Sequence, residues 1–215
     1  MDRNEIINSI ESERSFLEDK LKYLINHIGN IPIANKKIMP YGWRKAAKGR
    51  TVWRIIEEII SQNLEMLSSD LGFKSVTHAD SEVGVYDFKF SYSDSKEAFV
   101  NIKSAVKGGK RNKDDISKAK SLLEFYSNPK CGNLYVATFV IAFNDDMTIS
   151  ITKCIVCPVS WIPDVYVNPS NNGNLQSADY KDLSLAVKRT NAEFLEVFTK
   201  EYNVALEKKA KKINS

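Results

Sequence analysis

Two β-rich runs separated by a short polar turn constrain the fold of this chain more than any other feature. Residues 83–88 and 98–105 are rich in valine and aromatic residues, whereas residues 91–96 contain three serines with one tyrosine, one aspartate and one lysine. Runs of this composition around a Ser/Asp turn predict a β-hairpin. Because the two strands of a hairpin lie side by side, residues near Asp87 and near Asn101 are expected to be neighbours.

The second strand of this hairpin carries polar residues on one face. Alternation along the strand places Asn101 and Lys103 on the same face and sends Val100 and Ile102 to the other. Asp87, at the start of the hairpin, is thereby brought near an amide oxygen and an ammonium group. Hard oxygen ligands beside a lysine suit Mg²⁺ and a phosphodiester. We therefore expect a candidate catalytic and metal site here.

A helix upstream of the hairpin could supply a second carboxylate. Residues Thr51 to Leu67 are expected to be helical because apolar residues recur there at helical spacing, and Gly72 follows as a stop signal. Glu57 lies at the border of the apolar stripe, from which its carboxylate can reach a neighbouring strand. Glu58 is the competing choice.

These residues together resemble the active site of the PD-(D/E)xK nucleases. In this resemblance Asp87 takes the place of the aspartate, Lys103 that of the lysine, and Glu57 that of a helix glutamate found in some members. The sequence departs from the motif twice, because Tyr86 replaces the usual proline and Asn101 stands where an acidic residue is usual. The second departure removes one negative charge from the metal site.

A second match lies far along the chain, in residues 164–183. Four asparagines, one glutamine and one glycine fall within residues 168–176, a composition typical of an exposed turn. Asparagine and glutamine also bind adenine in the major groove, and glycine lets the backbone approach the bases. The segment is similar to the recognition loop of the EcoRV-like type II restriction endonucleases. Its candidate DNA-binding residues are Asn168, Ser170, Asn171, Asn172, Gly173, Asn174 and Gln176.

Further candidate DNA contacts flank the catalytic strand. Lys107, Lys110 and Arg111 follow it directly beside two glycines, and their charges could meet phosphates. The resemblance places Thr77 and His78 in a second loop that would face the minor groove. The net charge of +4 agrees with DNA binding but also with many other proteins.

The resemblance implies a type II restriction endonuclease: a homodimer that cuts double-stranded DNA at a short palindrome with Mg²⁺ and leaves blunt ends. Two alternatives remain open. The chain could be a non-catalytic, sequence-specific DNA-binding protein on a nuclease fold, for which Asn101 is the best support, or a repair or junction-resolving nuclease. The Asn-rich segment favours a reader of base edges over a reader of DNA shape.

The expected architecture is α+β, with a mixed β-sheet flanked by helices as in the restriction-endonuclease-like fold. We expect one nuclease domain over residues 1–215, in four parts. These are an N-terminal helix (1–28) that could form a dimer contact, a catalytic core (44–160), a recognition region (161–183), and a C-terminal helix with a basic tail (184–215). The expected further elements are a linker at Asn30–Tyr41, a helix at Asp114–Tyr126 capped by Asp114 or Asp115, strands at Leu134–Phe143 and Thr148–Cys157, and a helix at Ser184–Lys208.

The three cysteines bear on the compartment. Cys131, Cys154 and Cys157 are an odd number without a signal peptide, which favours a reducing, cytoplasmic location. Cys154 and Cys157 form a CxxC pair within a β-rich run, and we interpret them as buried apolar residues and not as zinc ligands. No apolar stretch reaches the roughly 18 residues that cross a bilayer, so no membrane partner is expected.

Overall fold

The computed structural model describes residues 1–44, 48–79, 84–93, 97–109, 112–170 and 173–213 of the chain. Its helices are α1 (Arg3–Ile28), α2 (Lys48–Met66), α3 (Ala119–Ser127) and α4 (Asn191–Ile213). Its strands are β1 (Asn30–Pro32), β2 (Ser75–His78), β3 (Phe88–Ser91), β4 (Ala98–Val106), β5 (Asp114–Lys118), β6 (Leu134–Phe143), β7 (Thr148–Pro158), β8 (Tyr166–Val167) and β9 (Asn174–Ser177). Two short 3₁₀ turns lie at Val159–Trp161 and Leu183–Leu185.

A mixed six-stranded sheet forms the centre of the molecule, with strand order β1-β7-β6-β4-β3-β2. Strands β4 and β6 are parallel, and the other neighbouring pairs in this sheet are antiparallel. A second sheet of three strands has the order β5-β9-β8. The prediction of an α+β fold with a mixed, helix-flanked sheet is therefore confirmed at this level.

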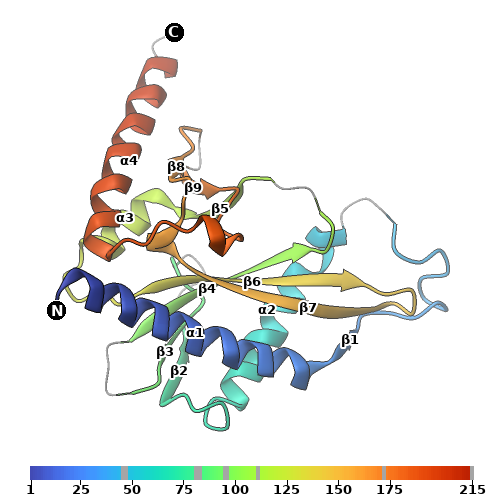
Figure 1. The fold of residues 1–215 in the computed structure, drawn as a ribbon. Coiled ribbons are helices and arrows are strands. Elements are labelled where there is room, and N and C mark those ends of the chain that lie inside the picture. The colour runs from blue at the N-terminus through green and yellow to red at the C-terminus, as the bar shows by residue number, and fades with distance from the viewer. Residues whose placement is uncertain (45–47, 80–83, 94–96, 110–111, 171–172, 214–215) are drawn as a thin grey trace.

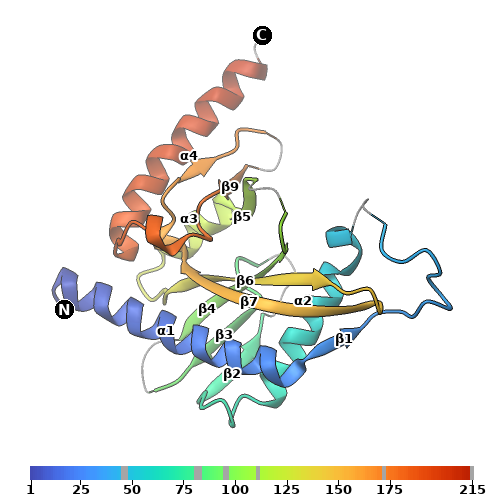
Figure 2. The ribbon, with the colours of Figure 1, turned by 45° about the vertical axis from the view of Figure 1, so that its right-hand side comes forward.

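The two faces of the large sheet carry two separate cores. Helices α1 and α2 lie along one face, whereas α3, α4 and the small sheet cover one end of the other (Figures 1 and 2). The first core includes Leu17, Leu21, Leu24, Ile56, Val100, Ile102 and Phe139. The second core includes Leu122, Tyr126, Val136, Leu175, Phe194 and Phe198. Beyond the small sheet, the second face stays open over Lys103, Ala105 and Val140, which line a large cavity.

The hairpin and most of the expected elements are present, but the first hairpin strand, expected at residues 83–88, lies instead at Phe88–Ser91, and residues 84–87 precede it without strand structure. Strand β6 has the predicted bounds, β7 runs one residue further than expected, and β3 pairs with β4 in antiparallel register. Helix α1 begins at a capping box, in which the Asp2 side chain accepts from Glu5 N and the Glu5 side chain accepts from Asp2 N. Gly72, with φ of 80°, closes the turn after α2 in the left-handed region that glycine favours.

The helix expected at Asp114–Tyr126 is wrong over its first five residues. Asp114–Lys118 is strand β5, which pairs with β9, and the helix α3 starts at Ala119. Asp114 does not cap a helix, because its carboxylate accepts hydrogen bonds from Tyr180 and Lys181. A distant segment of the chain thus decides the conformation of β5, and local spacing could not reveal it.

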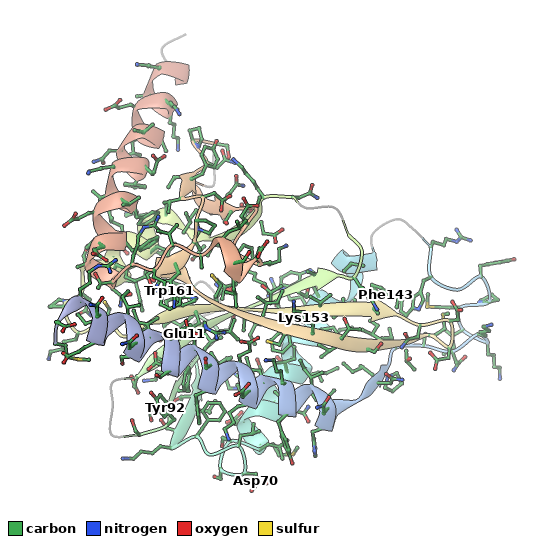
Figure 3. The ribbon with its side chains drawn as sticks, viewed as in Figure 1. Glu11, Asp70, Tyr92, Phe143, Lys153 and Trp161 are labelled. Carbon is green, nitrogen blue, oxygen red and sulfur yellow. The ribbon has the colours of Figure 1, made fainter. Side chains whose placement is uncertain are left out.

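The C-terminal helix was also placed wrongly at its start. Residues 186–190 have no regular secondary structure, and the Arg189 carbonyl accepts from the Trp161 indole at 3.0 Å, where the end of β7 meets the base of α4 (Figure 3). Helix α4 begins after Thr190, whose hydroxyl accepts from Glu193 N while the Glu193 side chain accepts from Thr190 N. This capping box marks the true start.

Two further expectations change. The linker expected at Asn30–Tyr41 begins with strand β1, which pairs with β7 at the sheet edge. The basic C-terminal residues continue α4 as a helix that projects from the body (Figure 1).

The cysteines of the CxxC pair lie on opposite faces of β7. Cys154 is buried in the first core and Cys157 in the second, so the two thiols cannot meet at one ion. Burial raises the pKa of Cys157 to about 12. Both cysteines thus act as small apolar residues, as expected. Within the described residues, none of the helices has the length and apolar character needed to cross a membrane.

Candidate active site

Asp87 is held at the point where strand β3 begins. Its N–H donates to the Val100 carbonyl at 2.8 Å, and its carboxylate accepts from Ile102 N at 2.5 Å. Strand β3 begins at Phe88, which pairs with Val100 on β4. Asp87 precedes this pair, and its side chain takes the place of a backbone acceptor for the N–H of Ile102. This bond fixes the carboxylate beside the edge of β4.

Asn101 presents an amide in a fixed orientation. The residue is 7% exposed, and its Nδ2 donates to the carbonyls of Val85 at 3.1 Å and Ile116 at 3.3 Å. Its Oδ1 is buried and has no hydrogen-bond partner among the described residues. Because a buried acceptor without a partner is costly, the oxygen is well suited to a ligand that the protein alone does not provide.

Glu57, Asp87, Asn101 and Lys103 line one cavity of about 420 Å³. Helix α2 contributes Glu57 from its polar side, because its buried stripe consists of Val52, Ile56, Ile60 and Leu64. The structure therefore brings the four predicted catalytic residues together. Glu58 is exposed and accepts from the Gln62 side chain at 2.7 Å, and it lines a smaller neighbouring cavity with Glu57 and Asp87. Glu57 is the better placed of the two.

Burial and the charge of Asp87 disfavour the ionised form of Glu57. Burial raises the pKa of Glu57 to about 7, and the charge of Asp87 adds to the rise, while Lys103 and Arg54 oppose it. Burial also raises the pKa of Asp87, against the hydrogen bond from Ile102 and the charge of Lys103. The residue Asp87 is nevertheless exposed to solvent, and it lines the cavity. A cation between the two groups would relieve this repulsion.

The donor set fits a hard divalent cation. Among the described residues, no three side chains of histidine, cysteine, aspartate or glutamate gather at one point. The available oxygens are the two carboxylates and the unpartnered amide oxygen of Asn101. Carboxylate and amide oxygens are the ligands that Mg²⁺ uses, and it commonly keeps several waters as well.

The described part of the predicted recognition segment includes strand β9 and is not a loop throughout. Asn174 lies on β9 and lines the same cavity as Asp87, and its Oδ1 is buried without a partner among the described residues. The Gln176 side chain donates to Asp115 on β5 at 2.6 Å. Asn168 accepts from Ser170 N, and Gly173 has a φ of 56° that completes the turn. Asn171 and Asn172 lie outside the described residues.

The other predicted DNA contacts differ in where the structure places them. Lys107 lines a cavity of about 790 Å³ together with Lys103 and Glu57, whereas Lys110 and Arg111 lie outside the described residues. Thr77 and His78 are not in a loop, because both belong to strand β2 and pair with β3. His78 forms an ion pair with Glu65 when protonated, with Nε2 at 3.2 Å from the carboxylate, and it lines a small cavity with Asp87.

Two site residues were missed at the sequence level. Trp53 and Arg54 precede Glu57 on α2, and both line the cavity that holds the carboxylates. The available signal was their position, because both lie off the stripe of α2 that packs on the sheet. An aromatic residue followed by a basic residue, one turn before a candidate acid on the same helix, could have been included in the predicted site.

A search against protein-family models found no match to this chain, and a search of curated proteins found no significant relative. The geometry of the cavity is therefore the basis for any functional assignment.

Proposed function

We propose that this chain is a Mg²⁺-dependent endonuclease that cuts double-stranded DNA, and specifically a type II restriction endonuclease with the PD-(D/E)xK fold. In this proposal it acts as a homodimer on a short palindromic site and leaves blunt ends. The observation that carries the proposal is the meeting of Glu57, Asp87, Asn101 and Lys103 in one cavity, with the Asn101 oxygen unpartnered. Lysine beside such oxygen ligands suits phosphodiester hydrolysis.

The proposed cation would be held by Asp87, Glu57 and the Asn101 oxygen. When bound, Mg²⁺ supplies charge stabilisation at the phosphate and favours the ionised form of a water molecule. Lys103 binds a non-bridging oxygen of the scissile phosphate, where its ammonium stabilises the charge that grows in the transition state. The Ile102 N–H keeps the Asp87 carboxylate aimed at the cavity.

The amide side chain of Asn101 affects both the orientation of its oxygen and the total charge of the proposed metal site. Because Val85 and Ile116 occupy both hydrogens of the amide, its oxygen is the group that faces the ligand. The site offers two charged oxygens and one neutral oxygen, so the negative charge of the DNA phosphate meets less repulsion than it would beside three carboxylates.

The recognition role falls to the small sheet. Asn174 and Gln176 are consecutive residues of one face of β9, and Asn174 reaches the catalytic cavity. Side chains that read bases would thereby lie directly beside those that cut. A homodimer places two such sites in twofold symmetry, which matches cleavage of both strands of a palindrome.

A plasmid-cleavage assay tests the proposal. Purified protein is incubated with supercoiled DNA in Mg²⁺ and in EDTA, and the ends of any products are sequenced. We expect discrete fragments with a common short palindrome, in Mg²⁺ only. Random nicking would favour a repair or junction nuclease. Specific binding without cleavage would favour a non-catalytic DNA-binding protein, and absence of both would contradict the proposal.

A further inference from the structure

Trp53 is a large aromatic residue that neither core of the described structure includes. Its neighbour Val52 and the residues Ile56, Ile60 and Leu64 are fully buried and fix which side of α2 faces the sheet. Trp53 follows Val52 by one position, which is about 100° around the helix. The side chain is half-buried and lies beside the first core, on the side of α2 that carries Glu57.

The indole lies at the boundary of two cavities. Trp53, Glu57 and Lys103 line both the cavity of about 420 Å³ that holds the carboxylates and the neighbouring cavity of about 790 Å³. A ligand whose phosphate reaches Lys103 from either cavity would therefore lie close to the Trp53 side chain. An aromatic side chain in the lining of both cavities can pack against an aromatic or apolar part of that ligand.

A cation accompanies the ring. The Arg54 guanidinium carbon lies 4.2 Å from the centroid of the Trp53 ring, within the range of a cation–π contact. Arg54 also lines the smaller cavity, and its charge acts on both Glu57 and Asp87. An indole with a guanidinium over its ring offers groups for both parts of a nucleotide, an aromatic surface for the base and a positive charge for the phosphate.

We propose that Trp53 is a stacking platform for the nucleobase next to the scissile phosphate, and that Arg54 holds the ring in place. This inference rests on the proposed nuclease function. Stacking on an indole tolerates any base, since every base has a π-face, so Trp53 supplies affinity and position at the cut and not sequence discrimination. The base must expose one face to be stacked, so the contact belongs to a nucleotide that has parted from its neighbour on one side.

The test compares Trp53→Leu and Trp53→Phe with the wild type on two duplexes, one intact and one with an abasic nucleotide beside the mapped cleavage position. Dissociation constants and cleavage rates are measured for each pair. We expect Trp53→Leu to weaken binding of intact DNA by about 5- to 150-fold, and Trp53→Phe to keep most of the affinity. On abasic DNA the wild type should bind as weakly as Trp53→Leu does, with no further loss in the variant.

Trp43→Phe is the matched control. Trp43 is also half-buried, but its ring packs edge-on against Phe143, with centroids 4.8 Å apart, away from the lining of both cavities. This variant should bind and cut as the wild type does. A Trp53→Leu loss that is equally large on intact and abasic DNA would show a structural role and overturn the inference, while nuclease activity would stand. A wild type that neither binds nor cuts DNA would overturn the proposed function together with it.

Discussion

Asn101 holds its amide in one orientation because two carbonyls take both of its hydrogens. In Asn101→Asp, a carboxylate oxygen would face the Val85 and Ile116 carbonyls. We expect the variant to lose about 2 kcal/mol or more in EDTA, which lowers Tm by about 4 °C or more. Mg²⁺ should raise the Tm of Asn101→Asp more than that of the wild type, because the added charge then has a partner.

Thermal unfolding with and without Mg²⁺ checks this expectation, and Asn101→Ala is the control. The alanine variant loses the same two hydrogen bonds but adds no charge, so Mg²⁺ should not rescue it. If Asn101→Asp proved as stable as the wild type in EDTA, the orientation assigned to the amide would be wrong.

Glu57 makes cation binding depend on pH near neutrality. Its pKa is raised to about 7, and only the ionised carboxylate is a good ligand. Mg²⁺ affinity should therefore rise as pH increases towards 7, by up to about tenfold per pH unit, and level off above it. Calorimetric titration from pH 5.5 to 8.5 measures this profile. Glu57→Gln should bind more weakly and with a flatter profile, whereas an unchanged profile in that variant would remove Glu57 from the ligand set.

At the scale of elements, patterns confined to one segment were predicted well. The helical spacing around Glu57, the alternation in β4 and the apolar run of β6 each depend on neighbours within the same segment. The structure departs from the prediction where contacts with a distant segment of the chain determine the local conformation. Lys181 and Tyr180 bind Asp114 in its strand, and Trp161 donates to the carbonyl of Arg189 in the irregular segment before α4.

The candidate site divides in the same way. Asp87, Asn101 and Lys103 could be predicted because a hairpin fixes their register locally. The carbonyl of Ile116, which orients Asn101, comes from a strand that the sequence alone did not reveal. Trp53 was missed because an aromatic residue on a helix is more often part of a core.

Besides its apolar contacts, helix α1 makes a polar contact with the large sheet through a buried acid. Glu13 is 7% exposed and accepts from the Tyr135 hydroxyl at 2.7 Å and the Asn133 amide at 2.8 Å. Burial raises the pKa of Glu13 above its ordinary value of 4.5. The folded state thus binds this proton more tightly than the unfolded chain does, so the free energy of unfolding falls as pH rises from about 4.5 through the folded pKa.

Glu13→Gln keeps an oxygen acceptor without the charge. At neutral pH it should be more stable than the wild type by on the order of 1–3 kcal/mol, the desolvation penalty of a buried group, and the gain should vanish below pH 4.5. Urea unfolding at several pH values measures the difference. Glu11→Gln is the control of opposite sign, because ion pairing with Arg14 lowers the pKa of Glu11 against the effect of burial. That variant should lose stability above pH 4.5, and a gain of the same sign in both would contradict the account of Glu13.

Variants of Asn174 and Lys107 should separate recognition of the DNA sequence from general affinity for DNA. Asn174→Ala is expected to lower affinity for the cognate site by roughly 1–3 kcal/mol while leaving random DNA nearly unaffected. Lys107→Ala should weaken binding to all sequences and reduce the salt dependence by about one phosphate contact. Binding measured on both DNAs at several salt concentrations distinguishes the two. Equal losses on cognate and random DNA for Asn174→Ala would remove β9 from base recognition.

At the scale of the whole molecule, the elements that carry the candidate site residues meet at the open part of the second face of the large sheet. Helix α2 brings Glu57 and Trp53 to it from one side, the hairpin brings Asp87, and the small sheet brings Asn174 from the other. The first core holds α2 on one face of the large sheet, the second core holds the small sheet on the other, and the hairpin belongs to the large sheet itself, so the cavity is built on rigid supports. Such support suits a site whose charges must stay apart until a cation and a phosphate arrive.

Mg²⁺-dependent DNA cleavage by single variants tests the central claim most directly. Asp87→Ala and Lys103→Ala are compared with the wild type, and with Asp19→Ala and Lys153→Ala as controls that change the same residue types at exposed positions of α1 and β7. We predict losses of 100-fold or more for both site variants, as is typical when a group that stabilises a transition state is removed, and wild-type rates for both controls. Cleavage at the wild-type rate by Asp87→Ala and Lys103→Ala would contradict the assignment of this cavity as the active site.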